Sequence, residues 1–339
     1  MEEFPTTKSK LLYREFFKGA RKLNLTSDLG LGVSLIDVFD LGKEKRTGSY
    51  VLHGEDLTII ETSASPSIPY VLKGIKELGI APKQIKNIIV THIHLDHAGG
   101  VGLLLESCPN AKVIVHSRGA RHLADPAKLI LGAKAVYGNL FDELFNPILP
   151  VPEDRLIVKE DGESLQVAEN RTLTFYDTPG HAKHHFSIHD SLSNGIFTGD
   201  TIGVYYPQVL EKGLELILPS TSPNQFDPVA MLQSLEKIEA IKVERIYFGH
   251  FGMSNNPNEV YEQLKYWLPK FVAAGKKVLE ENYKETADRQ QSILTEALHR
   301  DVVGYLAEKN VYLNKDCLEI LKLDFNVCAM GIIDYLTKK

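Results

Sequence analysis

Residues 91–100 read Thr-His-Ile-His-Leu-Asp-His-Ala-Gly-Gly and directly follow the apolar run 88–90. Side chains that bind metals well crowd into this stretch: His92, His94, Asp96 and His97. A buried imidazole needs a partner for each ring nitrogen, and a buried carboxylate needs several. A cation satisfies all of these groups at once. The stretch therefore predicts a metal-binding loop at the end of a buried strand.

The composition is that of an ordinary globular protein. The chain has 339 residues, of which 43% are hydrophobic and 24% are charged. This length suits one large domain with an appendage, or two domains. The net charge of −6 gives no overall attraction to nucleic acid or to anionic membranes. We therefore expect neither a nucleic-acid partner nor a membrane partner.

Signals for export and for disulfide bonding are weak. No apolar run is long enough to span a bilayer, and residues 1–4 are acidic and lack the apolar segment of a secretory signal. The cysteines are widely spaced and odd in number, which indicates neither a disulfide framework nor a thiolate metal site: Cys108, Cys317 and Cys328. We expect a cytoplasmic protein with reduced thiols.

Apolar runs and turn signals predict two groups of strands. The first group lies at residues 33–39, 49–52, 57–61, 88–91 and 112–116. The second group lies at residues 155–158, 172–177, 185–189, 195–198 and 245–248. Helices are predicted to begin at Ser65-Pro66 and Asp227-Pro228, and another to span 99–105. Two such groups suggest two sheets covered by helices on the outside, which is an αββα sandwich.

Strand signals disappear from about residue 256 onward. Apolar residues at helical spacing predict a helix around Trp267, with Pro269 as a kink or break, and further helices up to Lys339. Two interpretations remain open, since these helices either only stabilise the sandwich or shape the substrate entrance or a dimer interface. We divide the chain into a catalytic domain, 1–256, and a C-terminal helical extension, 257–339.

Three more candidate ligands each follow a predicted strand, with a glycine directly before the ligand. His181 follows Pro179-Gly180, Asp200 follows Gly199, and His250 follows Gly249. An apolar strand, then glycine, then histidine or aspartate is the pattern expected of a loop-borne metal site on a rigid scaffold. Three repetitions of the pattern predict that these side chains complete the site begun by the first stretch.

The order of these motifs resembles the metallo-β-lactamase-fold superfamily, and within it the glyoxalase-II-type hydrolases. The resemblance covers roughly residues 30–255. It implies an αββα sandwich with a dinuclear site in a cleft along one edge. It also implies that the first metal is held by His92, His94 and His181, that the second is held by Asp96, His97 and His250, and that Asp200 bridges them.

Five histidines and two aspartates suit zinc, and also iron or manganese, so we expect two divalent ions per chain. The flavo-diiron branch of the superfamily usually carries a carboxylate at the position of His94. Its imidazole therefore favours hydrolysis over oxygen reduction. The resemblance also implies that a hydroxide shared by the metals attacks the substrate and that Asp96 shuttles the proton.

Five further residues have possible roles near the ligands. Glu61 stands where the superfamily usually has an aspartate that supports the metal loop, so it either gives that support or is a plain strand-end carboxylate. His185 lies four residues after His181 and is expected to orient a ligand by hydrogen bonding. Tyr205 and Tyr206 either donate a hydrogen bond to the developing oxyanion or only pack. His184 is expected at the surface or at the rim of the cleft.

The sequence predicts a metal-dependent hydrolase of a small ester-like substrate, either a thioester or a lactone. Two alternatives stay open. The first is a non-hydrolytic diiron protein that binds oxygen or senses redox state, because similar ligand sets hold iron. The second is a phosphodiesterase, which basic residues in the cleft would support. The expected partner is a small-molecule substrate, and a homodimer through the helical extension is a further expectation.

Overall fold

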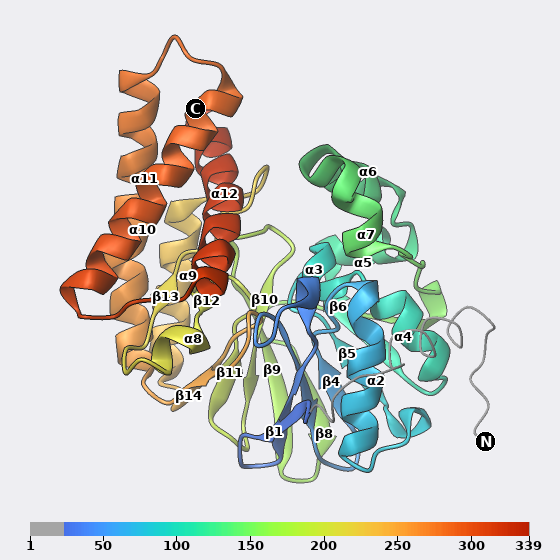
Figure 1. The fold of residues 1–339 in the computed structure, drawn as a ribbon. Coiled ribbons are helices and arrows are strands. Elements are labelled where there is room, and N and C mark those ends of the chain that lie inside the picture. The colour runs from blue at the N-terminus through green and yellow to red at the C-terminus, as the bar shows by residue number, and fades with distance from the viewer. Residues whose placement is uncertain (1–23, 339) are drawn as a thin grey trace.

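A computed structural model describes residues 24–338 as two packed β-sheets with helices on both outer sides (Figure 1). The first sheet runs in spatial order from β1 to β7. Its strands are β1 (Thr26–Asp28), β2 (Val33–Asp37), β3 (Gly48–Leu52), β4 (Thr58–Ile60), β5 (Asn87–Ile89), β6 (Lys112–His116) and β7 (Leu156–Lys159). The strands from β1 to β4 are antiparallel, and those from β4 to β7 are parallel.

The second sheet has the order β15-β14-β11-β10-β9-β8. Its strands are β8 (Ser164–Ala168), β9 (Arg171–Asp177), β10 (Phe186–Asp190), β11 (Gly195–Phe197), β14 (Arg245–Tyr247) and β15 (Met253–Ser254). All neighbours are antiparallel except β11 and β14, which are parallel. A separate two-stranded sheet pairs β12 (Val204–Tyr205) with β13 (Ile217–Leu218).

Helices cover the outer face of each sheet. Beside the first sheet lie α2 (Ile68–Glu77), α3 (Leu95–Ala98), α4 (Val101–Ser107), α5 (Ser117–Ala124), α6 (Ala127–Tyr137) and α7 (Phe141–Phe145) (Figure 1). Beside the second lie α8 (Pro207–Leu210), α9 (Pro228–Ile241), α10 (Pro257–Glu281), α11 (Ala287–Glu308) and α12 (Lys315–Thr337). In Figure 1, α6 and α12 extend beyond the same end of the sandwich, one on each side.

Alternation along the strands of the first sheet divides its side chains between two cores. Ile88 and Val113 point outward and pack with the helices, whereas Ile89 and Ile114 point inward. The inner core between the sheets also contains Phe175 and other side chains of the second sheet. Successive side chains of a strand point to opposite faces. Sheet strands with both faces buried therefore read as continuous apolar runs in the sequence.

The predicted αββα sandwich with C-terminal helices is confirmed. One strand assignment is wrong: the strand predicted at 155–158 was placed in the second group, but β7 pairs in parallel with β6 of the first sheet. Pairing between distant segments leaves no local signature, so the sequence alone did not reveal it. The predicted helix at 99–105 corresponds to α4, which begins and ends two residues later, and the separate short helix α3 before it contains Asp96 and His97.

The C-terminal helices share one hydrophobic core with the second sheet. Trp267 of α10, Leu298 of α11 and Phe325 of α12 belong to the same cluster as Ile196 and Ile246 of that sheet. Helix α10 starts at Pro257, where the extension was predicted to begin, and continues through Pro269. The division into two domains stays a prediction. Among residues 24–338, no helix is both long enough and apolar enough to cross a membrane.

A buried arginine ties the two sheets together and yields a stability prediction. Arg171 of β9 is fully buried and donates to both carboxylate oxygens of Asp190, at 2.9 and 2.6 Å. It also donates to the carbonyls of Gly32 and His53 beside the first sheet. We expect Arg171→Met to lower the free energy of unfolding by about 3–5 kcal/mol, because it leaves a buried carboxylate without its partner.

Urea unfolding followed by circular dichroism measures this loss. The control is Lys322→Met, which breaks the ion pair between Lys322 and Glu296 on exposed surface and is expected to leave the midpoint unchanged. Equal midpoints for the two variants would contradict the assigned role of Arg171.

Candidate metal centre

The first four candidate ligands leave β5 on a short loop and enter α3. His92 and His94 lie in the loop, and His94 is the extended residue before the first turn of α3. The carbonyl of His94 accepts from the backbone N–H groups of His97 and Ala98. This local fold places Asp96 and His97 one turn away from the two loop histidines. The sequence motif therefore folds into two adjacent pairs of ligands, one in the loop and one in α3.

The remaining candidates follow strands of the second sheet. His181 lies beyond β9, Asp200 beyond β11 and His250 beyond β14. Gly199 directly precedes Asp200, and Gly249 directly precedes His250. The backbone at both glycines lies very close to residues of the first metal-binding loop. A Cβ on Gly199 would lie 2.4 Å from Thr91 Oγ1, and one on Gly249 would lie 2.7 Å from the ring of His97. Only glycine lets these loops come near enough to the first sheet.

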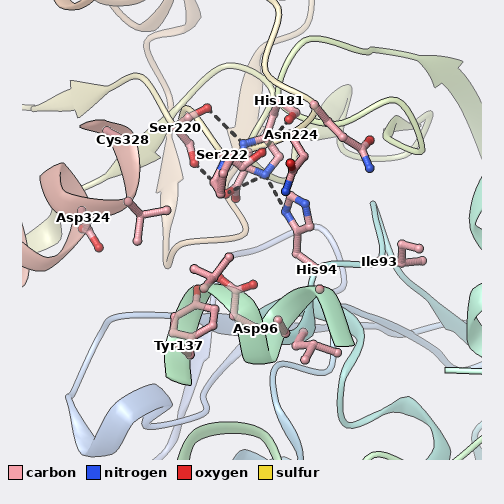
Figure 2. Close-up of a pocket in the computed structure, with 18 of the residues that line it drawn as sticks. Ile93, His94, Asp96, Tyr137, His181, Ser220, Ser222, Asn224, Asp324 and Cys328 are labelled. Atoms are coloured by element: carbon pink, nitrogen blue, oxygen red, sulfur yellow. Dashed lines mark hydrogen bonds and ion pairs between the residues drawn. The ribbon is translucent and has the colours of Figure 1, made fainter. Parts of the chain in front are cut away.

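The seven side chains converge into one cluster. Figure 2 labels three of them, His94, Asp96 and His181. Potential ligand atoms lie within 4.8 Å of one another in three sets: His92, His94 and His181; His92, His97 and Asp200; and Asp96, His97 and His250. The first and third sets are the two triads that the motif order predicts. One oxygen of Asp200 lies 3.5 Å from His250 Nε2 and 3.6 Å from His181 Nε2, which places this carboxylate between the triads.

Buried polar atoms without partners show that the cluster fits a cation. In the described part of the chain, His92 Nε2, His97 Nε2 and Asp200 Oδ1 are buried and form no hydrogen bond. His97 Nε2 and Asp200 Oδ1 are 3.3 Å apart, but they do not align as a hydrogen bond. Unsatisfied buried groups of this kind are costly in a protein interior. Imidazole nitrogens and carboxylate oxygens are also the donors that zinc, iron and manganese accept.

The electrostatics of the site favour the protonation states that metals bind at three of the seven candidate ligands, whereas at His97 and His250 the neighbouring carboxylates raise the pKa against the effect of burial. Burial, reinforced by neighbouring imidazoles, lowers the pKa values of His92 and His94 well below the usual range. Burial alone would raise the pKa of Asp200, but His250, His97 and His181 hold it well below its usual value. Metal ligands must be neutral imidazoles and ionised carboxylates. The chain thus holds these three residues ready for coordination.

Hydrogen bonds fix which nitrogen faces the centre in three of the histidines. His97 Nδ1 donates to Glu61 Oε2 at 2.9 Å, and His181 Nδ1 donates to the carbonyl of Ser220 at 3.0 Å. His92 Nδ1 lies 3.0 Å from the hydroxyl of Thr91. In each of these three rings, the Nε2 atom therefore faces the centre of the cluster. Such outer partners orient ligands and raise their basicity.

Glu61 and His185 both lie where support for the ligands is needed. Glu61 is buried, and its second oxygen accepts from the backbone N–H of Thr91 at 2.9 Å. Its extra methylene therefore still allows contact with the metal loop. His185 Nε2 accepts from the backbone N–H of Asp200 at 3.3 Å, while its Nδ1 lies 3.0 Å from Thr178 Oγ1. These contacts favour the supporting interpretation of both residues.

The two tyrosines differ in position. Tyr206 lines the cavity, but its hydroxyl is 2.9 Å from Asp324 Oδ2. Tyr205 is buried, stacks on Phe248 with ring centroids 5.2 Å apart, and is absent from the cavity wall. The geometry thus favours packing for Tyr205. His184 also departs from expectation, because it is buried against the cavity, where burial lowers its pKa to about 3.

Sequence reasoning missed a chain of polar contacts behind His250. Its Nδ1 lies 3.3 Å from the hydroxyl of Thr47, which donates to Asp40 at 3.0 Å. Arg46 then bridges Asp40 and Asp324 of α12, at 3.2 and 2.9 Å. The C-terminal extension is therefore linked to a candidate ligand through buried side chains. The loop that supplies Asp40, Arg46 and Thr47 has no periodic pattern or motif that could have revealed this network.

A cavity of about 310 Å³ opens onto the cluster (Figure 2). His94, Asp96, His181, Asp200 and His250 form its base. Its walls come from α6 on one side and α12 on the other, as the labelled Tyr137, Asp324 and Cys328 show in Figure 2. A substrate in this cavity would therefore contact both the candidate ligands and the C-terminal extension.

Several curated proteins resemble part of the chain. The atrochrysone carboxyl ACP thioesterase of Aspergillus fumigatus is 27% identical over 53% of this chain and 42% of its own length. The hydroxyacylglutathione hydrolase of Legionella pneumophila is 26% identical over 35% and 34%. The N-acyl homoserine lactonase of Azorhizobium caulinodans is 27% identical over 52% and 62%. The chain thus spans less than two thirds of the length of each of these relatives.

Solved structures share the fold over nearly the whole chain. A metallo-beta-lactamase superfamily protein from the archaeon Sulfolobus tokodaii superposes with a TM-score of 0.63 at 24% identity, covering 89% of this chain and 98% of the other. The profile of the metallo-beta-lactamase superfamily matches residues 45–250, which include all seven candidate ligands. The match covers more than half of the chain, so the protein belongs to the metallo-beta-lactamase superfamily.

Proposed function

We propose that the protein is a dinuclear metal-dependent hydrolase of a small ester-like substrate, a thioester or a lactone. The observation that carries this proposal is the cavity that opens directly onto two adjacent ligand triads, with an imidazole, His94, at the position that favours hydrolysis. The names of the three curated relatives support the same classes, since they are a thioesterase, a hydroxyacylglutathione hydrolase and a lactonase.

Each ion has its own set of side chains. His92, His94 and His181 would hold one ion, Asp96, His97 and His250 the other, and Asp200 both. Zinc suits these ligands, and iron and manganese are the alternatives. When bound, two such ions supply a hydroxide nucleophile at neutral pH and polarise the substrate carbonyl.

The chain itself supplies proton transfer and orientation. The Asp96 side chain is 28% exposed and lines the cavity, so its carboxylate can reach both water and substrate. We assign it the transfer of a proton from water to the leaving sulfur or oxygen. Water adds at the acyl carbon and the bond to the leaving atom breaks. A thioester gives a carboxylic acid and a thiol, and a lactone gives one hydroxy acid. Ser220 keeps Asp200 in place by donating to its Oδ2 at 2.9 Å.

Metal removal tests the proposal directly. We expect a chelator to abolish hydrolysis of thioesters or lactones, and added zinc, manganese or iron to restore it, because no serine or cysteine nucleophile is involved. The assay panel includes phosphodiesters, and elemental analysis of protein purified without added metal identifies the ion. Visible absorption bands that respond to oxygen, with no hydrolysis of any ester, would instead favour the diiron alternative.

The role of Asp96 predicts a loss of turnover. We expect Asp96→Asn to lower kcat about 10²–10⁴-fold, the usual contribution of a positioned proton-transfer group. Metal content measured on the same sample separates this loss from loss of an ion. A variant that retains full kcat with both ions bound would remove Asp96 from the mechanism.

The contacts of Glu61 predict a loss of metal affinity. Glutamate accepts both from Thr91 N–H and from His97 Nδ1, whereas glutamine offers one acceptor and places an N–H donor against the other donor. We expect Glu61→Gln to weaken metal binding about 10–100-fold in competition with a chromogenic chelator.

The control for this variant is Glu308→Gln on the exposed end of α11. It carries the same change of charge far from any hydrogen bond to a ligand. Unchanged chelator competition in Glu61→Gln, at an unchanged unfolding midpoint, would show that Glu61 does not support the site.

A further inference from the structure

The helix α6 is apolar but has no buried residue. Its sequence from Ala127 to Tyr137 carries only two charged residues, Lys128 and Lys134. An apolar helix of a globular protein normally buries its surface against a core. Exposed apolar surface beside a cavity marks a ligand groove or a docking surface. Four of its side chains pack in part against the small core that contains Phe141 and Phe145, namely Leu129, Ile130, Ala133 and Tyr137, and the rest of its apolar surface is open.

One face of α6 forms a wall of the cavity above the candidate metal centre. The side chains on this face recur at helical spacing: Leu129, Ala133, Val136 and Tyr137, with Gly132 between them. Phe145 of α7 continues the same wall. Because Gly132 has no atom within 4 Å of the place where a Cβ would stand, the wall is open at that point. The space beside α6 is thus bounded by hydrocarbon.

The opposite wall combines apolar side chains with the polar side chains of Ser222, Asn224, Gln225 and Asp324. Helix α12 contributes Phe325, Val327 and Cys328, and the loop before α9 adds Pro223. These residues come from the C-terminal extension and from loops of the second sheet. Figure 2 shows Tyr137 and Cys328 on different sides of the space that leads to His94. The apolar space is therefore continuous with the candidate metal centre.

The charges near this space are already neutralised or lie at its edge. Arg46 is engaged by Asp40 and Asp324, so its charge is balanced by two carboxylates. Lys128 and His122 also line a second cavity with Arg121 and Pro152, which places them at the outer boundary. No unpaired cation of the described residues lines the middle of the cavity. A charged substrate body would lack a partner there, whereas an alkyl chain would be buried favourably.

We infer that the space between α6 and α12 binds the alkyl chain of an acyl substrate, with the reacting carbonyl at the metal centre. The inference rests on the proposed hydrolase function and names its substrate class, a medium-chain acyl thioester. In such a thioester the acyl chain is the apolar part, and the thiol side is polar and leaves toward the edge at Lys128. Hydrolysis splits the carbon–sulfur bond with water and gives a fatty acid and a thiol.

A series of thioesters with one common thiol tests the inference. The acyl groups run from acetyl through butyryl, hexanoyl and octanoyl to decanoyl, and kcat/KM is measured with zinc-loaded protein. We expect kcat/KM to rise about fourfold per methylene until the chain fills the cavity, as expected for moving a methylene out of water. A flat or falling series overturns the inference. Hydrolysis of the acetyl member in a flat series leaves the hydrolase proposal standing.

Two substitutions on α6 assign the effect to this wall. Val136→Asn places an amide in the apolar space and is expected to lower the decanoyl-to-acetyl ratio of kcat/KM at least tenfold. Leu131→Asn makes a comparable change on the outer side of the same helix, where the residue is 71% exposed and lines no part of the cavity. We expect this control to keep the wild-type ratio. An equal ratio in both variants would overturn the inference.

Binding without turnover provides a separate measurement. Isothermal titration of zinc-loaded protein with decanoate and with butyrate compares the two chain lengths independently of any reaction. We expect decanoate to bind at least a hundredfold more tightly, and Val136→Asn to remove most of this difference. Equal affinities overturn the inference. If decanoate binds more tightly but neither a thioester nor a lactone is hydrolysed, the apolar site is supported and the proposed hydrolase function fails.

Discussion

The structure depends on bringing seven ligand side chains together with their lone pairs facing one another. Such an arrangement is repulsive and poorly solvated without a cation, as the partnerless atoms His92 Nε2, His97 Nε2 and Asp200 Oδ1 show. The fold maintains it because the rings of His92, His97 and His181 are held from behind. Glu61, Thr91 and the carbonyl of Ser220 fix the outer nitrogens, and the inner nitrogens have only the centre to face. The fold thus positions buried polar groups that a cation would satisfy.

The two sheets supply this geometry in different ways. The first sheet contributes four ligands from one continuous segment, so their relative positions follow from one loop and one helical turn. The second sheet contributes three ligands from separate strands, and their positions depend on how the sheets pack. Gly199 and Gly249 show how close that packing is, since any side chain there would meet Thr91 or His97. The buried pair of Arg171 and Asp190 reaches across to the first sheet and helps to fix the same distance.

The sequence predicted the sandwich and grouped the seven ligands because both signals are local. Each ligand follows an apolar strand, and the order of the motifs resembled one superfamily. The features that the sequence did not predict are long-range: β7 joins the first sheet, and Asp40, Arg46 and Thr47 stand behind His250. In a sequence, the polar residues of an irregular loop show the same pattern whether their side chains face solvent or a ligand. Glu61 either supports the metal loop or is a plain strand-end carboxylate. These two interpretations could be compared only when its distances to Thr91 and His97 were known.

The candidate ligands and the cavity walls lie on different elements, which explains how one scaffold can come to bind a particular substrate. The ligands lie on rigid strand ends, whereas the cavity walls come from α6, inserted after β6, and from α12 in the C-terminal extension. These two helices can change without disturbing the metal centre, except where Arg46 joins Asp324 to Asp40 and, through Thr47, to His250. That link makes the position of α12 and the orientation of His250 mutually dependent. The extension therefore forms part of the wall of the candidate site and does not only stabilise the sandwich, because its displacement would alter a candidate ligand as well as a wall.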